Sequence, residues 1–182
     1  MRIIPYGGCL AACLISLAQA APPPTPDTAS CHHFVQSFYN WYVPPAQKIT
    51  NEPPSNLALR QKADAFTADL LHALRVDADA SAHAKGDLVG LDFDPFLSSQ
   101  DPATHYDVRA ATWRNNKCSV EIWSTSPTDT ADKSRKPDVI ADLTLQQGHW
   151  KFQNFRYPEL NTDLLTVLAN LRQERQKAHA GH

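Results

Sequence analysis

Glycine is scarce in this 182-residue chain, which has six glycines and no glycine-rich pattern of the kind that binds dinucleotides or phosphates. Motifs for serine nucleophiles and zinc proteases are also missing. Neither sign of charge dominates, because 17 Lys and Arg face 19 Asp and Glu and leave a net charge of −2. That balance disfavours a nucleic-acid surface or a polybasic membrane patch. We therefore expect no cofactor, no resident metal, no nucleic-acid partner and no assigned catalytic residue.

Long hydrophobic runs are confined to residues 3–18, which follow a single base, Arg2. Small residues at Ala18 and Ala20 form the pattern that signal peptidase cleaves, so the sequence predicts a signal peptide over residues 1–20. The run is short for a membrane span, and we expect no transmembrane helix in the mature form. A lipobox-like segment ending at Cys13 is the alternative, and it would make the protein a lipoprotein anchored at that cysteine.

Two cysteines, Cys31 and Cys118, remain after the signal peptide is removed. An exported chain with two cysteines most simply forms one disulfide. Closing a loop of this length is expected to add about 4 kcal/mol of stability. No C-x-x-C pair is present, which argues against a redox catalyst.

The mature chain divides into a tether, one domain and a tail. Residues 21–29 are rich in proline and predict an extended spacer. The domain is expected over residues 30–178, and residues 179–182 are expected to form a frayed tail.

Three segments of the domain have the apolar periodicity of helices. The first helix is predicted to begin at a Ser30 cap and to end at residues 43–45, Val-Pro-Pro. A second, longer helix is predicted to begin at a Ser55 cap and to fade toward Gly86. The last helix is predicted after a cap at Asn161 or Thr162. Between them, Asp94 before a proline predicts a short helical turn over residues 96–99.

Alternating apolar residues predict two hairpins. In the first, Tyr106, Val108, Ala110 and Thr112 share one face, and residues 115–116, Asn-Asn, turn the chain into the strand of Cys118. The second hairpin turns at Gly148. One apolar face per strand predicts an antiparallel sheet covered on one side. The expected fold is therefore α+β, with N-terminal helices packed on a curved four-stranded antiparallel sheet and a C-terminal helix.

Three segments carry a resemblance to a known family: residues 34–42 (FVQSFYNWY), residues 91–101 (LDFDPFLSSQD) and residues 148–158 (GHWKFQNFRYP). Their order resembles the DUF3828 family of small bacterial envelope proteins, several of which are lipoproteins. The resemblance implies an NTF2-like or cystatin-like cone of helices on a curved sheet, in a protein of the bacterial envelope. It implies no established catalytic activity. The predicted signal peptide makes the periplasm the expected location.

Three carboxylates, Asp92, Asp94 and Asp101, cluster in an irregular segment. Calcium prefers such oxygen ligands, but the spacing is not that of an EF-hand, and Asp94 is expected to cap the following turn. Capping and loop hydrogen bonding are therefore the favoured interpretation, with a bound cation or ligand as the alternative.

Acid–base chemistry is the second alternative. His105, Asp107 and Arg109 share one strand face, which is expected to look outward, away from any pocket. If that face lined a pocket instead, His105, Asp107 or His149 could serve as a base and Arg109 could bind an anion. The chain would then be a small cofactor-independent isomerase, dehydratase or hydrolase.

Two tryptophans, Trp41 and Trp123, lie off the main apolar stripes and are the predicted contacts for a partner, because exposed tryptophans often anchor protein interfaces. The favoured function is a non-enzymatic binding module for an envelope protein or a small envelope ligand. Its partner could belong to an envelope complex or could be a toxic effector, in which case the chain is an immunity protein.

Overall fold

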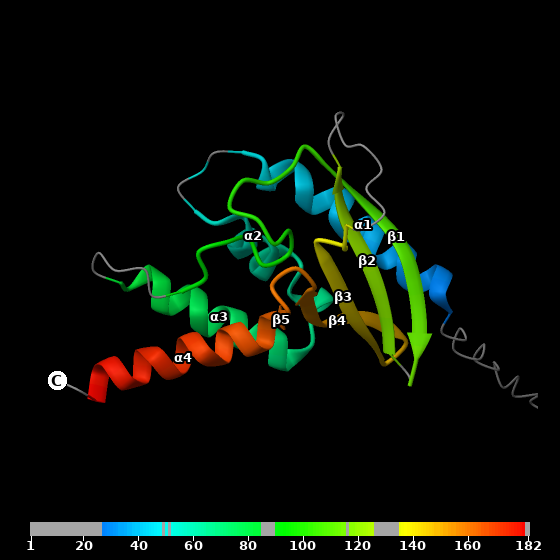
Figure 1. Ribbon diagram of the computed structural model, residues 1–182. Coiled ribbons are helices and arrows are strands. Elements are labelled where there is room, and N and C mark those ends of the chain that lie inside the picture. The colour runs from blue at the N-terminus through cyan, green and yellow to red at the C-terminus, as the bar shows by residue number, and fades with distance from the viewer. Residues whose placement is uncertain are drawn as a thin grey trace, which may run out of the picture.

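The computed structural model describes residues 27–48, 50, 52–84, 90–115, 117–125 and 135–180. The chain forms helices on an antiparallel sheet, so the α+β class is confirmed (Figure 1). The helices are α1 (Thr28–Ala46), α2 (Pro54–Gln61), the 3-10 helix η1 (Ala63–Ala65), α3 (Ala68–Ala82) and α4 (Leu164–Ala180). The predicted signal peptide, the lipobox-like segment and most of the tether lie outside the described residues.

Five strands form the sheet in the order β1-β2-β3-β4-β5, and every pairing is antiparallel. The strands are β1 (His105–Arg114), β2 (Lys117–Thr125), β3 (Val139–Gln146), β4 (His149–Tyr157) and β5 (Thr162–Asp163). Both predicted hairpins are present, with positive φ at Asn115 in one turn and at Gln147 and Gly148 in the other. The two-residue β5 adds a strand to the four expected, because so short a strand has no alternation to read.

The predicted alternation of β1 fails after Val108. A bulge lies between Val108 and Ala111, so Ala111 and Trp113 turn toward the core, while Ala110 and Thr112 are exposed. A bulge inserts one residue into a strand and reverses the faces beyond it. The side chain of His32 in α1 also reaches this point, with Nε2 3.1 Å from the carbonyl oxygen of Val108.

The first helix is longer at both ends than expected. Asp27, and not Ser30, is the cap, and its Oδ1 accepts a 2.6 Å hydrogen bond from the backbone N–H of Ser30. At the other end α1 continues through Pro44 and Pro45 to Ala46. Proline fixes φ near −65°, which is a helical value, so the last turn keeps its shape although the prolines donate no hydrogen bond.

The second predicted helix is broken into α2, η1 and α3. Its Ser55 cap is wrong, because α2 begins after Pro53 with no side-chain cap. Phe66 is extended and forms a parallel bridge with Phe152, and the N–H of Thr67 donates to the Phe152 carbonyl at 2.9 Å. This pairing with the sheet outweighs local helix propensity. Thr67 then caps α3.

Two smaller expectations also change. Residues 95–98 form a tight turn closed by a bridge between Asp94 and Ser99, in place of a short helix. The last helix is preceded by Asp163, whose Oδ1 accepts from the N–H of Thr166 at 3.0 Å, so neither Asn161 nor Thr162 has the expected role. Helix α4 extends to Ala180, into the segment expected to fray.

The core lies between α1 and one face of the sheet, and Phe38 is at its centre. The ring of Phe38 contacts several other rings, those of Tyr39, Trp41, Tyr42, Phe66, Phe96 and Phe152. A disulfide joins Cys31 of α1 to Cys118 of β2, and both residues are fully buried. The predicted disulfide is therefore confirmed, and it joins the first helix to the second strand.

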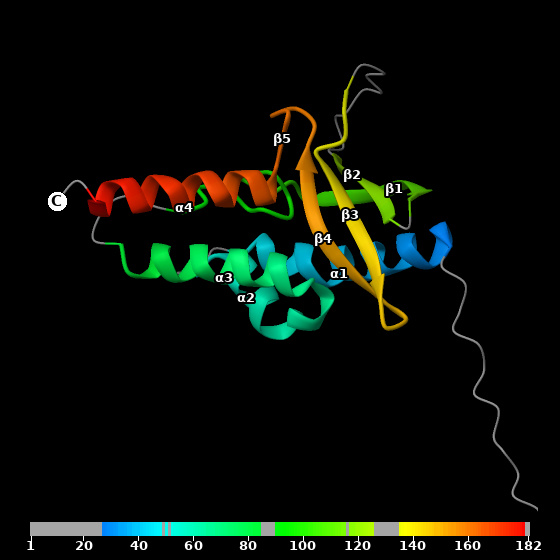
Figure 2. The same ribbon diagram turned by 90° about the horizontal axis from the view of Figure 1, so that it is seen from below.

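Helices α3 and α4 lie side by side and extend beyond the sheet, whereas α1 lies against one sheet face (Figure 2). Within the described residues, no helix covers the other face of β1, β2 and β3. We call this surface the open sheet face. No helix of the described part is both long and apolar enough to span a membrane.

Candidate functional site

The predicted site residues fall into three separate places. Trp123 and Arg109 lie together on the open sheet face, and Asp92, Asp94 and Asp101 line a groove between the helices and a loop. Trp41 lies on α1, where its half-buried ring packs against Phe38 and Lys62 lies over it at 5.2 Å. Trp41 is therefore fixed by contacts within the domain, with Phe38 and Lys62, and it lies apart from Trp123.

Trp123 is flanked by two arginines on the open sheet face. The guanidinium carbon of Arg109 lies 4.8 Å from the ring centroid of Trp123, and that of Arg135 lies 5.9 Å away. The indole Nε1–H donates to Glu121 at 3.2 Å. We call Arg109, Trp123 and Arg135 the tryptophan patch. Cation–π contacts of this kind hold an aromatic ring in place before any partner binds.

The two arginines are themselves fixed by carboxylates. Arg109 pairs with Asp107 at 3.3 Å, and Arg135 pairs with Asp138 at 3.0 Å. Asp138 also accepts from the backbone N–H of Ser124 at 2.6 Å, which ties it to the end of β2. The patch is thus a preorganised array of one aromatic ring and alternating charges.

The neighbouring part of the open sheet face also carries charge. Arg156 forms two hydrogen bonds to Asp142, at 2.7 and 2.8 Å, and one to Ser119 at 3.2 Å. Beside this group is a shallow hollow of about 250 Å³. Its lining residues are Thr112, Arg114, Lys117, Ser119, Glu121, Ile140 and Arg156. Most residues that line the hollow are polar or charged, and Ile140 is the one apolar side chain among them.

Within the described residues, the side chains of the acid–base alternative line neither the shallow hollow nor the groove described next. His105 pairs with Asp107 at 3.1 Å, and both residues, with Arg109, look outward from β1, as expected. His149 is exposed at the β3–β4 turn.

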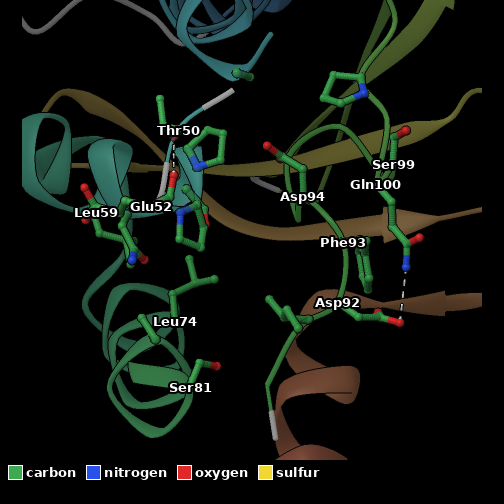
Figure 3. A pocket seen from close by; sticks show the side chains of 18 of the residues that line it. Thr50, Glu52, Leu59, Leu74, Ser81, Asp92, Phe93, Asp94, Ser99 and Gln100 are labelled. Carbon is green, nitrogen blue, oxygen red and sulfur yellow. Dashed lines mark hydrogen bonds between the residues drawn. The ribbon is translucent and has the colours of Figure 1, made fainter. Parts of the chain in front are cut away.

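The groove has a volume of about 1150 Å³ and lies between the C-terminal end of α1, α2, α3 and residues 90–104 (Figure 3). Figure 3 shows Leu59, Leu74 and Ser81 on the helical side and Asp92, Phe93 and Gln100 on the loop side. Its charged lining residues are Lys48, Glu52, Asp77, Asp92, Asp94 and Asp101. We call it the acidic groove.

Asp94 closes the turn at the base of the loop. Its Oδ1 accepts from the N–H groups of Phe96 and Leu97, at 2.9 and 3.2 Å, and its Oδ2 accepts from the Tyr42 hydroxyl at 2.5 Å. Burial raises the pKa of Asp94 to about 6, although the three hydrogen bonds act to lower it. Burial also raises the pKa of Tyr42, and the Asp94 charge adds to that shift. The capping role predicted for Asp94 is present.

Asp77 of α3 joins the loop of residues 90–104 to α4. The sequence patterns did not indicate this residue. It is 4% exposed, its Oδ2 accepts from the Leu91 N–H at 2.9 Å, and its Oδ1 pairs with Arg175 of α4 at 2.7 Å. Gly90 allows this approach, because a Cβ there would meet the hydroxyl of Ser81 at 1.9 Å. Asp77 lies in an Ala/Asp-rich helix, and no local sequence pattern predicts its role, because its two partners lie 14 and 98 residues away in the sequence.

A metal site at the three loop carboxylates is not supported. Across the part of the chain that the structure describes, no three His, Cys, Asp or Glu side chains gather so that they could hold a metal ion. Asp94 is occupied by its own backbone and by Tyr42. Asp92 and Asp101 are exposed at the rim.

In sequence, the chain matches no protein-family model and no curated protein. Two solved structures contain a chain of similar fold, and both are of the type VI effector–immunity complex Tae3–Tai3 from Ralstonia pickettii. The selenomethionine form is 22% identical over 69% of this chain and 94% of that chain, with a TM-score of 0.45. The native form is 22% identical over 71% and 94%, with a TM-score of 0.47. Similarity at this level assigns neither an activity nor a partner to this chain.

Proposed function

We propose that this chain is an exported, disulfide-stabilised protein of the bacterial envelope that binds a protein partner through its open sheet face. The observation that carries the proposal is the tryptophan patch, in which Trp123 lies between Arg109 and Arg135. Tryptophan and arginine, together with tyrosine, are enriched among the residues that dominate binding energy in protein interfaces.

The geometry of the patch supports a protein partner over a small ligand. The patch lies on a sheet surface and not in an enclosed cavity, and its side chains are already held by Asp107, Glu121 and Asp138. Because these side chains are fixed beforehand, little conformational entropy is lost when a partner covers them. A small molecule would leave most of such a surface exposed, whereas a protein can cover it.

Export is supported by the disulfide and by the pattern of the first 20 residues. A buried disulfide forms and persists in an oxidising compartment, which for a bacterium is the periplasm. Identifying the bound partner would distinguish a component of an envelope complex from a toxic effector. An immunity protein would form a tight one-to-one complex with an effector.

Site-specific photocrosslinking tests the proposal in the cells that make the protein. A photoreactive amino acid replaces Ala110 or Thr112, which are exposed next to the patch, and His72, exposed on α3, is the control position. We expect one discrete adduct from positions 110 and 112 and none from position 72. In a Trp123→Ala background the adduct should weaken, and in a Trp41→Phe background it should persist. Adducts that do not depend on Trp123, or no adduct at all, would overturn the proposal.

A further inference from the structure

We infer that the acidic groove receives an arginine or lysine side chain carried on an extended segment of the same protein partner. The assignment to that partner rests on the proposed function, whereas the chemistry of the groove stands on its own lining residues. The groove is a second contact surface, distinct from the tryptophan patch.

The charges of the groove favour a cation. Five carboxylates line it and one lysine, Lys48, lies beside them. Two of the carboxylates have their own cationic partners, since Glu52 pairs with Arg60 and Asp77 pairs with Arg175. When these two arginines and Lys48 are counted together, five negative groups still face three positive ones, and the groove keeps an excess of negative charge.

The excess charge is concentrated on the loop side. Asp92 and Asp101 are both exposed at the rim, and Asp92 has a 3.4 Å contact with the Gln100 amide. Asp94 lies deeper and is engaged by Tyr42. Asp92 and Asp101 are therefore the two carboxylates best placed to meet an incoming cation, because neither must give up a strong ion pair.

Apolar side chains also line the groove. Leu59 and Leu74 lie on its helical side, and Leu91 and Phe93 belong to the loop on its other side. Arginine and lysine have long aliphatic stems that pack on apolar surface while their charged ends stay in polar surroundings. A groove lined by both apolar side chains and carboxylates complements both parts of such a side chain.

The size and position of the groove favour a polypeptide segment. Small-molecule pockets usually have volumes of about 300–1000 Å³, and this groove holds about 1150 Å³. Thr104 lines the groove, and Asp107, three residues later, pairs with Trp123 across β1 and β2. Three residues of a strand span roughly 10 Å, so one partner can reach both surfaces.

The groove is also held open by its own structure. Asp77 ties the loop at Leu91 to α3 and α4, and Gln47 at the end of α1 donates to the carbonyls of Ala103 and Thr104 at 2.9 and 2.7 Å. Both ends of the loop are therefore fastened to helices. A groove that exists before binding needs no ordering step to accept a segment.

Binding of defined peptides to the mature chain, residues 21–182, tests the inference. Two libraries of nine-residue peptides carry small and apolar residues at random positions around a central arginine or a central citrulline, which has the same shape without the charge. The retained fraction of each library is measured by mass spectrometry. We expect the arginine library to be retained at least tenfold more than the citrulline library.

Three variants of the chain test which residues produce the preference for the arginine library. The double substitution Asp92→Asn with Asp101→Asn should remove the preference for arginine. Asp69→Asn with Asp79→Asn makes the same change of charge on exposed residues of α3 that do not line the groove, and it should leave the preference intact. Trp123→Ala should also leave it intact, so failure of this inference is distinguishable from failure of the proposed function.

Three outcomes would overturn the inference. The wild-type chain could retain both libraries equally, the preference could persist in the Asp92 and Asp101 variant, or the α3 control could lose it as well. A fourth outcome also would: if free arginine competes as well as an arginine peptide at the same concentration, the groove binds a small cation and not a polypeptide segment.

Discussion

The hydroxyl of Tyr42 donates a 2.5 Å hydrogen bond to Asp94, which joins α1 to the loop that forms one side of the acidic groove. The two residues are 52 positions apart in the sequence, and the contact holds the carboxylate in a partly buried position. The pKa of Asp94 is consequently raised from its ordinary value of 3.8 to about 6, mainly by burial.

That shift predicts how stability depends on pH. Because the folded-state pKa lies above the unfolded one, the folded state binds more protons than the unfolded state between the two values. The contribution of Asp94 to the free energy of unfolding is therefore fully present below about pH 4 and is lost as the pH rises through about 6. The free energy of unfolding falls by about 3 kcal/mol over this range.

Asp94→Asn isolates this effect. The amide keeps an oxygen for the N–H groups of Phe96 and Leu97 and removes the titration. Denaturant unfolding of both proteins from pH 4 to pH 7 should show a stability difference that changes across this range. A difference that stays constant with pH would contradict the assignment.

Reduction of the disulfide should weaken the fold strongly. Cys31 and Cys118 are 87 residues apart, and removing a cross-link of this length should cost about 4 kcal/mol because the unfolded chain regains entropy. For a chain of this size we expect the melting temperature to fall by about 10 °C. Thermal unfolding of the wild type, with and without reductant, measures it. If a Cys31→Ser, Cys118→Ser variant has the same melting temperature as the oxidised wild type, the disulfide does not stabilise the fold.

Gly90→Ala should loosen the loop side of the groove. A Cβ at this position would meet the Ser81 hydroxyl at 1.9 Å and Asp77 Oδ2 at 2.9 Å, so the hydrogen bond from Leu91 to Asp77 must lengthen or break. We expect a stability loss of about 1–3 kcal/mol. Hydrogen exchange at the Leu91 amide should speed up more than exchange in the core strands. Unchanged protection of that amide would show that Gly90 is not required.

Phe38→Ala should be among the most damaging single changes. Its ring is 4% exposed and contacts rings from α1, β4 and the segments around Phe66 and Phe96. Truncating a buried phenylalanine costs about 3–5 kcal/mol. The half-buried Phe34, one turn earlier, contacts Phe152 and is the matched control, with a smaller expected cost. Equal losses of stability in the two variants would contradict this picture of the core.

The sequence predicted the contacts that local patterns encode. The disulfide was expected because an exported chain with two cysteines most simply forms one bridge, and the apolar periodicity places both Cys31 and Cys118 on core-facing positions. The positive φ values at Asn115 and Gly148 match residues that favour turns. The sequence indicates Arg109 and Trp123 as candidate binding residues, but no local pattern predicts the contact between them.

The remaining features depend on contacts between distant segments. The bulge after Val108 changes the strand faces and has no marker in the sequence. Phe66 interrupts a helical pattern because it pairs with Phe152, 86 residues later in the chain. The acidic groove has the same origin, since α1, α2, α3 and the loop each supply only part of its lining.

The most direct test of the account is quantitative capture of partners by the mature protein from its own cell envelope, with wild type, Trp123→Ala and Trp41→Phe compared side by side. We predict one protein captured in near-equal amount by wild type and Trp41→Phe, and reduced at least about thirtyfold by Trp123→Ala, as for a residue worth about 2 kcal/mol of binding. Capture of that protein by Trp123→Ala at the wild-type level, or the absence of any such protein, would contradict the account.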